Sequence, residues 1–173
     1  IQAPMGGAVG PALAAAVSNA GGLGTLALWG ADIQTLRQQV RETRALTAKP
    51  FAVNLNLEFP QEERLEICLQ EGVPVISFFW REPSALVARA KSDGAIVLHT
   101  VSTAAEARQA VDCGVDVVVA QGWEAGGHVR GNVATMPLIP AVVDAVGPVP
   151  VIAAGGIADG RGLAAALALG ASG

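Results

Sequence analysis

The amino-acid sequence predicts an α/β fold in which repeated strand–helix units build a parallel sheet. Short apolar runs alternate with helical patterns at fairly even spacing along the chain, as in successive βα units. Hydrophobic residues make up 51% of the 173 residues and charged residues only 15%, which supplies apolar surface for a substantial core. The 21 glycines and the low aromatic content of 4% suit closely packed helices, so an all-β sandwich is disfavoured.

Seven apolar runs are predicted to be strands, each at the start of a unit. Strands that are buried on both faces of a parallel sheet read as nearly continuous runs of Val, Ile and Leu, and several of these runs do so. They are residues 1–3, 25–28, 51–55, 73–78, 95–98, 116–120 and 149–153.

Residues typical of helix starts and stops lie between the runs. Pro11 suits a first helical turn, and Asp32 suits an N-cap. Thr103 and Glu106 form a capping-box pattern. The remaining boundaries are predicted at Gly21, Pro83, Gly114, Gly147, Asp159 and Gly170.

One domain over residues 1–173 is predicted, because no linker-like shift in composition, low-complexity tract or charge run divides the chain. A doubly wound open sheet could hold seven strands, but regular units with functional-looking loops favour a (β/α)8 TIM barrel. Such barrels usually need about 250 residues. Residues 170–173 lie where an eighth strand should begin, so we expect a barrel truncated before that strand and incomplete at the C-terminus.

Charge and cysteine usage exclude several classes of protein. The net charge is −4 and the basic residues are scattered, which argues against nucleic-acid binding. No run approaches the roughly 18 apolar residues of a membrane span, and no signal-like segment opens the chain. Cys68 and Cys113 fall in predicted helices without metal-ligand spacing, so buried, reduced thiols, no metal site and a cytoplasmic protein are expected.

The loop after the sixth run carries His128 behind two glycines, where parallel α/β proteins bind their ligands. An imidazole exchanges protons near neutral pH, so His128 is a candidate general base. A lone histidine in a loop is also a common surface residue, and spacing does not decide between the two. Glu124 could orient His128 or cap a backbone donor. His99, at the end of the fifth run, is expected to have a positioning or structural role.

Gly155 and Gly156 follow the seventh run and could let backbone N–H groups approach an anion. The helix that begins near Asp159 would point its positive end at the same place, which favours a phosphate site. The alternative is that the two glycines only permit a tight turn between strand and helix.

Gln121 and Asn54 are amides at strand ends that could hydrogen-bond to the edge of a flavin, or cap loop backbone instead. Met5 and Gly6 offer a soft side chain and bare backbone that could border a flat cofactor, although ordinary packing explains Met5 equally well.

Five segments carry a resemblance to a known family. They are residues 1–7 (IQAPMGG), 18–24 (SNAGGLG), 51–55 (FAVNL), 120–128 (AQGWEAGGH) and 154–160 (AGGIADG). In this order, over essentially the whole chain, they closely resemble the nitronate monooxygenase family, formerly called the nitropropane dioxygenases. The EAGGH element is the most specific, and FMN-dependent enoyl-acyl carrier protein reductases and some NAD(P)H:quinone reductases resemble it too.

The resemblance implies a TIM barrel that binds FMN and uses O2 to convert alkyl nitronates, and in some members nitroalkanes, to carbonyl compounds and nitrite. It implies that His128 is the catalytic base for a neutral nitroalkane and positions or stabilises an already deprotonated nitronate. The positions that match FMN contacts of the family are Met5, Gly6, Asn54, Gln121, Gly155 and Gly156.

Two departures and two alternatives accompany this resemblance. Ala154 stands where some relatives have Ser, and Thr100 stands where some have Lys. Relatives continue with a further strand and a Gly-Thr or Gly-Ser turn that helps to hold the phosphate, so we expect residues 1–173 alone to bind FMN weakly or not at all. The alternatives are an NAD(P)H-dependent flavin reductase of quinones or enoyl thioesters, and a noncatalytic barrel remnant. A homo-oligomer is left open.

Overall fold

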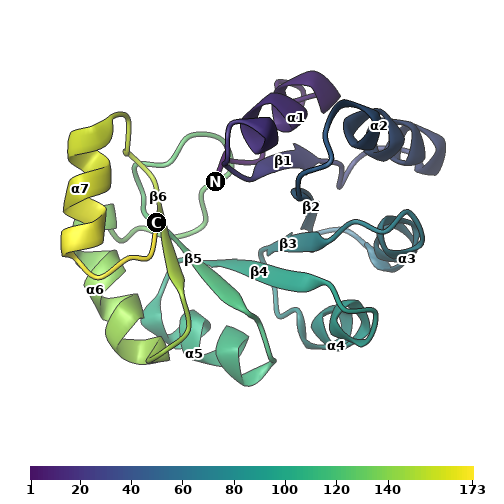
Figure 1. The fold of residues 1–173 in the computed structure, drawn as a ribbon. Helices are drawn as coiled ribbons and strands as arrows, with labels where there is room; N and C mark the ends of the chain where they lie inside the picture. The colour runs from purple at the N-terminus through teal and green to yellow at the C-terminus, as the bar shows by residue number, and fades with distance from the viewer. The chain divides into compact units, whose positions relative to one another are not determined.

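A computed structural model describes residues 1–173, which divide into two compact units (Figure 1). The first unit comprises residues 1–81 and 85–97, and the second comprises residues 82–84 and 98–173. None of the helices combines the length and apolar composition that crossing a bilayer requires.

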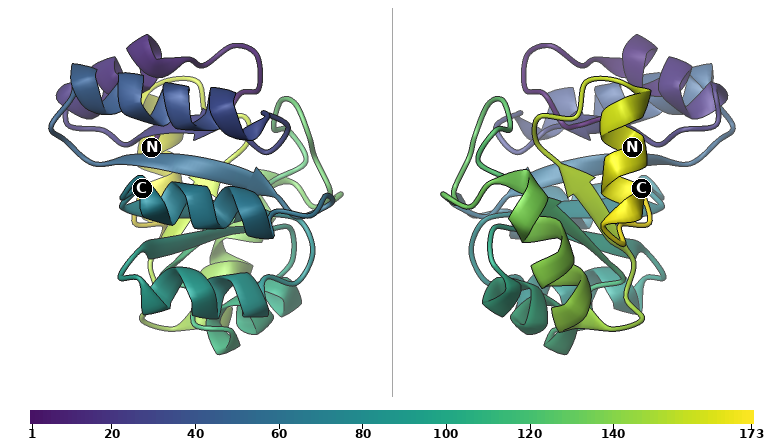
Figure 2. Two further views of the ribbon diagram at one scale, coloured as in Figure 1. Left: turned by 90° about the vertical axis from the view of Figure 1, so that its right-hand side faces the viewer. Right: turned by 90° about the vertical axis from the view of Figure 1, so that its left-hand side faces the viewer.

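In the first unit, three parallel strands lie in the order β1, β2, β3, and the register pairs Leu26 with Val53 and Val53 with Ile76. These three side chains are fully buried and form the centre of the unit's core. Helices α2 and α3 pack side by side (Figure 2). The elements are α1 (Pro11–Asn19), β1 (Gly24–Ala27), α2 (Ile33–Leu46), β2 (Phe51–Asn56), α3 (Glu62–Gln70), β3 (Val75–Phe79) and α4 (Ser84–Ser92, of which the first residue belongs to the second unit).

Local signals set the helix boundaries of this unit, as predicted. Pro11 occupies the first helical turn of α1, and Gly21 follows this helix with a φ of 89°. Asp32 is the N-cap of α2, where its side chain accepts a 2.9 Å hydrogen bond from the Thr35 N–H.

An ion-pair cluster ties α2 to the end of α3. Arg37 and Arg41 donate to the Glu71 carboxylate at 2.7 and 2.8 Å, and Arg44 donates to the Glu71 carbonyl. Hydrogen bonds from Arg41 and then Arg37 lower the pKa of Glu71 to about 2, against the opposing effect of burial. The cluster is expected to resist separation of the two helices at neutral pH.

In the second unit, three further strands are parallel, in the order β4, β5, β6, with Leu98 opposite Val117 and Ala120 opposite Ala153. A small core joins α6 and α7 through Ile139 and Ala166, and the two helices lie next to each other (Figure 2, right). The elements are β4 (Ile96–Val101, of which the first two residues belong to the first unit), α5 (Ala104–Asp112), β5 (Val117–Gln121), α6 (Thr135–Val146), β6 (Val151–Ala154) and α7 (Gly160–Ala168).

Residues 171–173 run beside β6 and bond to its backbone. The Ser172 N–H donates to the Val151 carbonyl at 2.7 Å, and the Ala153 N–H donates to the Gly173 carbonyl at 2.8 Å. The parallel strands of both units confirm the α/β class, while the closed eight-stranded barrel stays a prediction.

The prediction of a strand at residues 1–3 is wrong, whereas the other six runs each correspond to a strand. The Gln2 N–H does bond to the Leu23 carbonyl, but the next pairing uses a side chain. Gln2 Oε1 accepts from the Thr25 N–H at 3.0 Å, and Gln2 Nε2 donates to the Thr25 carbonyl at 3.3 Å. A side-chain amide thus replaces the backbone ladder that would have made these residues a strand.

The two cysteines differ in burial. Cys68 is buried, as predicted, and burial raises the pKa of its thiol to about 12. The prediction that Cys113 is buried is wrong, because this residue is half-buried and its Sγ lies 3.0 Å from Glu82 Oε1. Partial burial and the hydrogen bond to Glu82 raise the pKa of Cys113 to about 11, so both thiols are expected to be protonated at neutral pH.

Candidate active site after β5 and β6

The predicted site residues fall in both units. Met5, Gly6 and Asn54 belong to the first unit. The second unit holds the others, on the two loops that follow β5 and β6: Gln121, His128, Gly155 and Gly156.

Two hydrogen bonds hold the loop that carries His128, one at its neck, where its two ends meet, and one within it. The Trp123 N–H donates to the Val133 carbonyl at 2.8 Å, which closes the neck. Gln121, the last residue of β5, donates from Nε2 to the His128 carbonyl at 3.1 Å. The exposed His128 therefore has a backbone position that is set from the end of the strand.

Glu124 caps a helix, which is one of the two roles left open for it. Its Oε2 accepts a 2.8 Å hydrogen bond from the Thr135 N–H and lies 2.8 Å from Thr135 Oγ. The N-cap residue of α6, Ala134, has no side chain that could do this. Hydrogen bonds from its own N–H, from the Thr135 N–H and from the Thr135 hydroxyl hold the pKa of Glu124 below its usual value.

Gly155 and Gly156 form a turn that only glycine adopts readily, with φ values of 110° and 69°. The Gly155 carbonyl lies 2.9 Å from Thr135 Oγ, so the turn is attached to the start of α6. Neither glycine N–H donates to a carbonyl of this unit. Two adjacent donors without a backbone acceptor fit an anion such as a phosphate.

The same glycines are also required by packing. A Cβ atom at Gly122 would overlap the Thr135 hydroxyl and lie 2.5 Å from the Thr135 backbone nitrogen. A Cβ atom at Gly155 would lie 2.9 Å from Thr135 Oγ, and one at Gly156 would lie 3.1 Å from Glu124 Cβ. The tight turn is therefore observed, and phosphate binding stays a prediction.

The start of α7 is capped by a residue of the chain itself, and the prediction that this end faces a phosphate stays a prediction. Asp159 is the N-cap, and its Oδ1 accepts from the N–H groups of Arg161 at 2.9 Å and Gly162 at 3.3 Å. Hydrogen bonds from the Arg161 side chain, then from these N–H groups, lower the pKa of Asp159. A carboxylate of the chain itself therefore occupies these two donors.

In the first unit, Met5 and Gly6 lie in an exposed turn in which the Met5 carbonyl accepts from the N–H groups of Ala8 and Val9. A Cβ atom at Gly6 would meet nothing within 4 Å. Asn54 is buried in β2, and its Nδ2 donates to the Ser77 carbonyl at 3.2 Å and to Ser77 Oγ at 3.1 Å. Because the Asn54 Nδ2 is used in these two bonds, Oδ1 is the atom of this side chain that could bind a flavin, as an acceptor.

Sequence reasoning missed Thr135, because no motif links it to a carboxylate on a distant part of the chain. It also missed the backbone at Trp80 and Arg81, where φ is 63° and 48° although neither residue is glycine. An ion pair of 2.5 Å between Arg81 and Glu58 holds this turn after β3. Strained backbone of this kind often marks functional loops, and the residue types alone give no signal of it.

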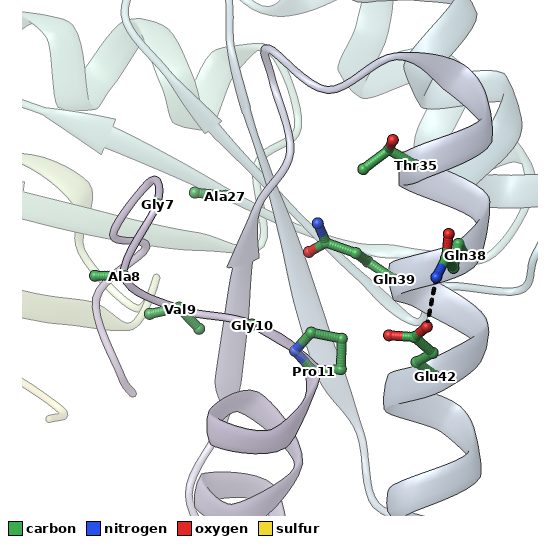
Figure 3. A pocket seen from close by; sticks show the side chains of 10 residues that line it. All are labelled: Gly7, Ala8, Val9, Gly10, Pro11, Ala27, Thr35, Gln38, Gln39 and Glu42. Atoms are coloured by element: carbon green, nitrogen blue, oxygen red, sulfur yellow. Dashed lines mark hydrogen bonds between the residues drawn. The ribbon is translucent and has the colours of Figure 1, made fainter.

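A pocket of about 400 Å³ lies elsewhere in the first unit, between the loop before α1 and one side of α2 (Figure 3). Its polar side is formed by α2, where Gln38 Nε2 donates to Glu42 Oε1 at 2.7 Å. None of the predicted site residues lines it. Its lining residues are Gly7, Ala8, Val9, Gly10, Pro11, Ala27, Thr35, Gln38, Gln39 and Glu42.

Comparisons with known proteins agree on one family. A model described as nitronate monooxygenase matches residues 1–63 and 58–173. The chain is 44% identical over 176 residues to the (3aS,4S,5R,7aS)-5-hydroxy-7a-methyl-1-oxo-octahydro-1H-indene-4-carboxyl-CoA dehydrogenase of Mycobacterium tuberculosis, covering 100% of this chain and 49% of that protein. It is 40% identical over 220 residues to a nitronate monooxygenase of Pseudomonas aeruginosa, covering 99% of this chain and 62% of that protein.

Among solved structures, FabK from Thermotoga maritima matches with a TM-score of 0.94 and 43% identity, over 98% of this chain and 54% of that chain. The chain thus spans about half the length of the first of these relatives.

Proposed function

Because the chain belongs to the nitronate monooxygenase family, we propose that it contributes the active site of an FMN-dependent oxidoreductase that converts alkyl nitronates and O2 to carbonyl compounds and nitrite. The observation that carries the proposal is the attachment of the His128 loop to the Gly155–Gly156 turn. Glu124 and Thr135 make that attachment through contacts of 2.8 and 2.9 Å. The proposed proton-transfer group, His128, and the two glycine N–H groups proposed to bind an anion lie on the two segments that this attachment joins.

Each site residue has a proposed task toward FMN. The N–H groups of Gly155 and Gly156 would hold the phosphate, and Gln121 would offer its Oε1 while its Nε2 holds the His128 carbonyl. Met5, Gly6 and Asn54 are proposed as further contacts on the resemblance alone. When bound, FMN would supply the electron transfer and the reaction with O2.

His128 would act differently on the two substrate forms. With a neutral nitroalkane, the neutral imidazole would accept the proton from the carbon that bears the nitro group. A nitronate has already lost that proton, so the imidazole would instead donate a hydrogen bond to the anion and hold it in place.

The substitution His128→Asn tests this assignment. We expect turnover of neutral nitroalkanes to fall by about 100-fold or more, which is the usual contribution of a general base. Turnover of preformed nitronates should fall much less, so the nitronate serves as an internal control. Steady-state kinetics on both forms give the answer, and equal losses on the two would contradict the role of base.

A second candidate is an NAD(P)H-dependent flavin reductase that acts on a thioester. It is supported by the 44% identity to a carboxyl-CoA dehydrogenase, which exceeds the 40% identity to a nitronate monooxygenase. Anaerobic visible absorption of the full-length protein separates the two. Flavin bands that a nitronate bleaches and NAD(P)H does not would support the monooxygenase, and rapid bleaching by NAD(P)H would support the reductase.

A further inference from the structure

We propose that Glu124 and Thr135 are a positioning pair that holds the His128 loop against the Gly155–Gly156 turn. Through this pair, the placement of the imidazole and of the two glycine N–H groups depends on one buried hydroxyl. The proposal deepens the proposed function, on which its flavin readout rests, and it assigns these residues a task beyond the capping of α6.

Thr135 lies where three segments meet. Its side chain is buried, with 7% of the residue exposed, and its Oγ is 2.8 Å from Glu124 Oε2 and 2.9 Å from the Gly155 carbonyl. A hydroxyl has a single proton, so it donates to one of these acceptors at a time. The first acceptor belongs to the His128 loop and the second to the glycine turn, so the hydroxyl lies between the two.

The fit around this hydroxyl leaves little room for another arrangement. A Cβ atom at either Gly122 or Gly155 would come within 3.0 Å of Thr135 Oγ. The Gly122 N–H also donates to the Ala154 carbonyl at 2.8 Å, which fixes the end of β5 to the end of β6. Thr135 therefore fills the space that the missing glycine side chains leave between the two loops.

Other polar contacts hold the loop but do not bond it to Gly155 or Gly156, against which Ala125 and Glu124 pack. The bond from Trp123 to Val133 closes its neck, and Arg130 forms a 3.3 Å ion pair with Glu106 on α5. Loss of the Thr135 hydroxyl should therefore release the loop from the turn without unfolding either one.

The start of α2 supplies a matched control. Asp32 accepts from the Thr35 N–H at 2.9 Å and lies 2.7 Å from Thr35 Oγ, which repeats the chemistry of Glu124 and Thr135. This cap belongs to the first unit, whereas the His128 loop and the glycine turn belong to the second. A purely structural role for Thr135 predicts that the two threonines respond alike to substitution.

The experiment compares Thr135→Val, Thr135→Ser and the control Thr35→Val in the full-length protein. The flavin readout is the dissociation constant of FMN, together with kcat at saturating FMN. We expect Thr135→Val to weaken FMN binding about tenfold, because the proposed phosphate donors are displaced. With a nitronate as substrate, it should lower kcat more than it changes KM, because the imidazole is displaced. Thr135→Ser, which keeps the hydroxyl, should restore both, and Thr35→Val should leave both unchanged.

A second readout needs no flavin. Trypsin can cleave after the exposed Arg130, and mass spectrometry reports cleavage at that bond alone. Thr135→Val should accelerate it severalfold and Thr35→Val should not. Equal cleavage in the two variants, or failure of Thr135→Ser to restore the wild-type rate, would overturn the proposal. Faster cleavage in a protein that binds no FMN would support the positioning pair and reject the proposed function.

Discussion

Helices α2 and α6 both begin with a threonine that is capped by a carboxylate, but the two residues of the pair are separated differently in the sequence. In both, a carboxylate accepts from a threonine N–H and lies within 2.8 Å of the same threonine's hydroxyl. Asp32 is three residues from Thr35, whereas Glu124 is 11 residues from Thr135. We call the first pair the near cap and the second pair the distant cap. The near cap holds only the first turn of its helix, while the distant cap also closes the loop that contains His128.

The largest expected effect on stability comes from substituting Gly122, which packs against Thr135 of the distant cap. Gly122→Ala would place a Cβ atom 2.5 Å from the Thr135 backbone nitrogen, so backbone has to move. We expect the free energy of unfolding to fall by about 3 kcal/mol, at the upper end of overpacking effects. Urea unfolding measures this loss.

Gly30, which precedes the near cap, provides the control for that substitution. A Cβ atom there would meet nothing within 4 Å. Gly30→Ala should change the free energy of unfolding by less than about 0.5 kcal/mol. Similar losses in the two variants would show that close packing does not distinguish the two helix starts.

A smaller effect is expected from Glu71, which links α2 to α3 over a long sequence distance. Its pKa is lowered to about 2, so its stabilising contribution is present above its ordinary pKa of 4.5 and is lost as the pH falls toward 2. Glu71→Gln should cost about 1–2 kcal/mol at pH 7, because two arginines lose a charged acceptor. Urea unfolding from pH 7 to 2.5 should show a shallower decline for the variant than for the wild type, and parallel curves would contradict this assignment.

The smallest effect on stability is expected from the capping carboxylates themselves. Glu124→Gln and Asp32→Asn each keep a carbonyl oxygen that can accept from the threonine N–H, so the thermal midpoint should fall slightly and equally in both. Only Glu124→Gln should accelerate trypsin cleavage after Arg130, because an amide oxygen accepts more weakly than a carboxylate and this cap alone closes the loop. A larger loss of thermal stability in Asp32→Asn would mean that the near cap carries more of the fold than the distant one.

Local signals allowed much of the fold to be predicted from the sequence. Asp32 capped α2 as expected, and the Glu106 N–H donates to Thr103 Oγ at 3.1 Å at the start of α5. Even there the pattern was only partly right, because the Glu106 carboxylate accepts from the N–H and hydroxyl of Ser102 rather than from the Thr103 N–H. Neighbouring residues decide these contacts, so their spacing is visible in the sequence.

Contacts between distant residues could not be predicted in this way. Gln2 replaced a strand pairing with its side chain, which no periodicity reveals. Glu124 was open between two roles because its partner, Thr135, lies beyond the loop. Asp159 was correctly expected at the start of α7, but its acceptance of hydrogen bonds from the N–H groups of Arg161 and Gly162 depends on a side-chain conformation.

The close packing at Gly122 divides the His128 loop into positions that evolution or a protein engineer can and cannot alter. Because a side chain at position 122 would strike backbone as well as the Thr135 hydroxyl, no second substitution at position 135 makes room for it. Trp123 and Arg130 are exposed, and a Cβ atom at Gly126 meets nothing within 4 Å. Substitutions at these three positions, proline at position 123 excepted, should therefore keep the bond from the residue 123 N–H to the Val133 carbonyl and leave the loop closed.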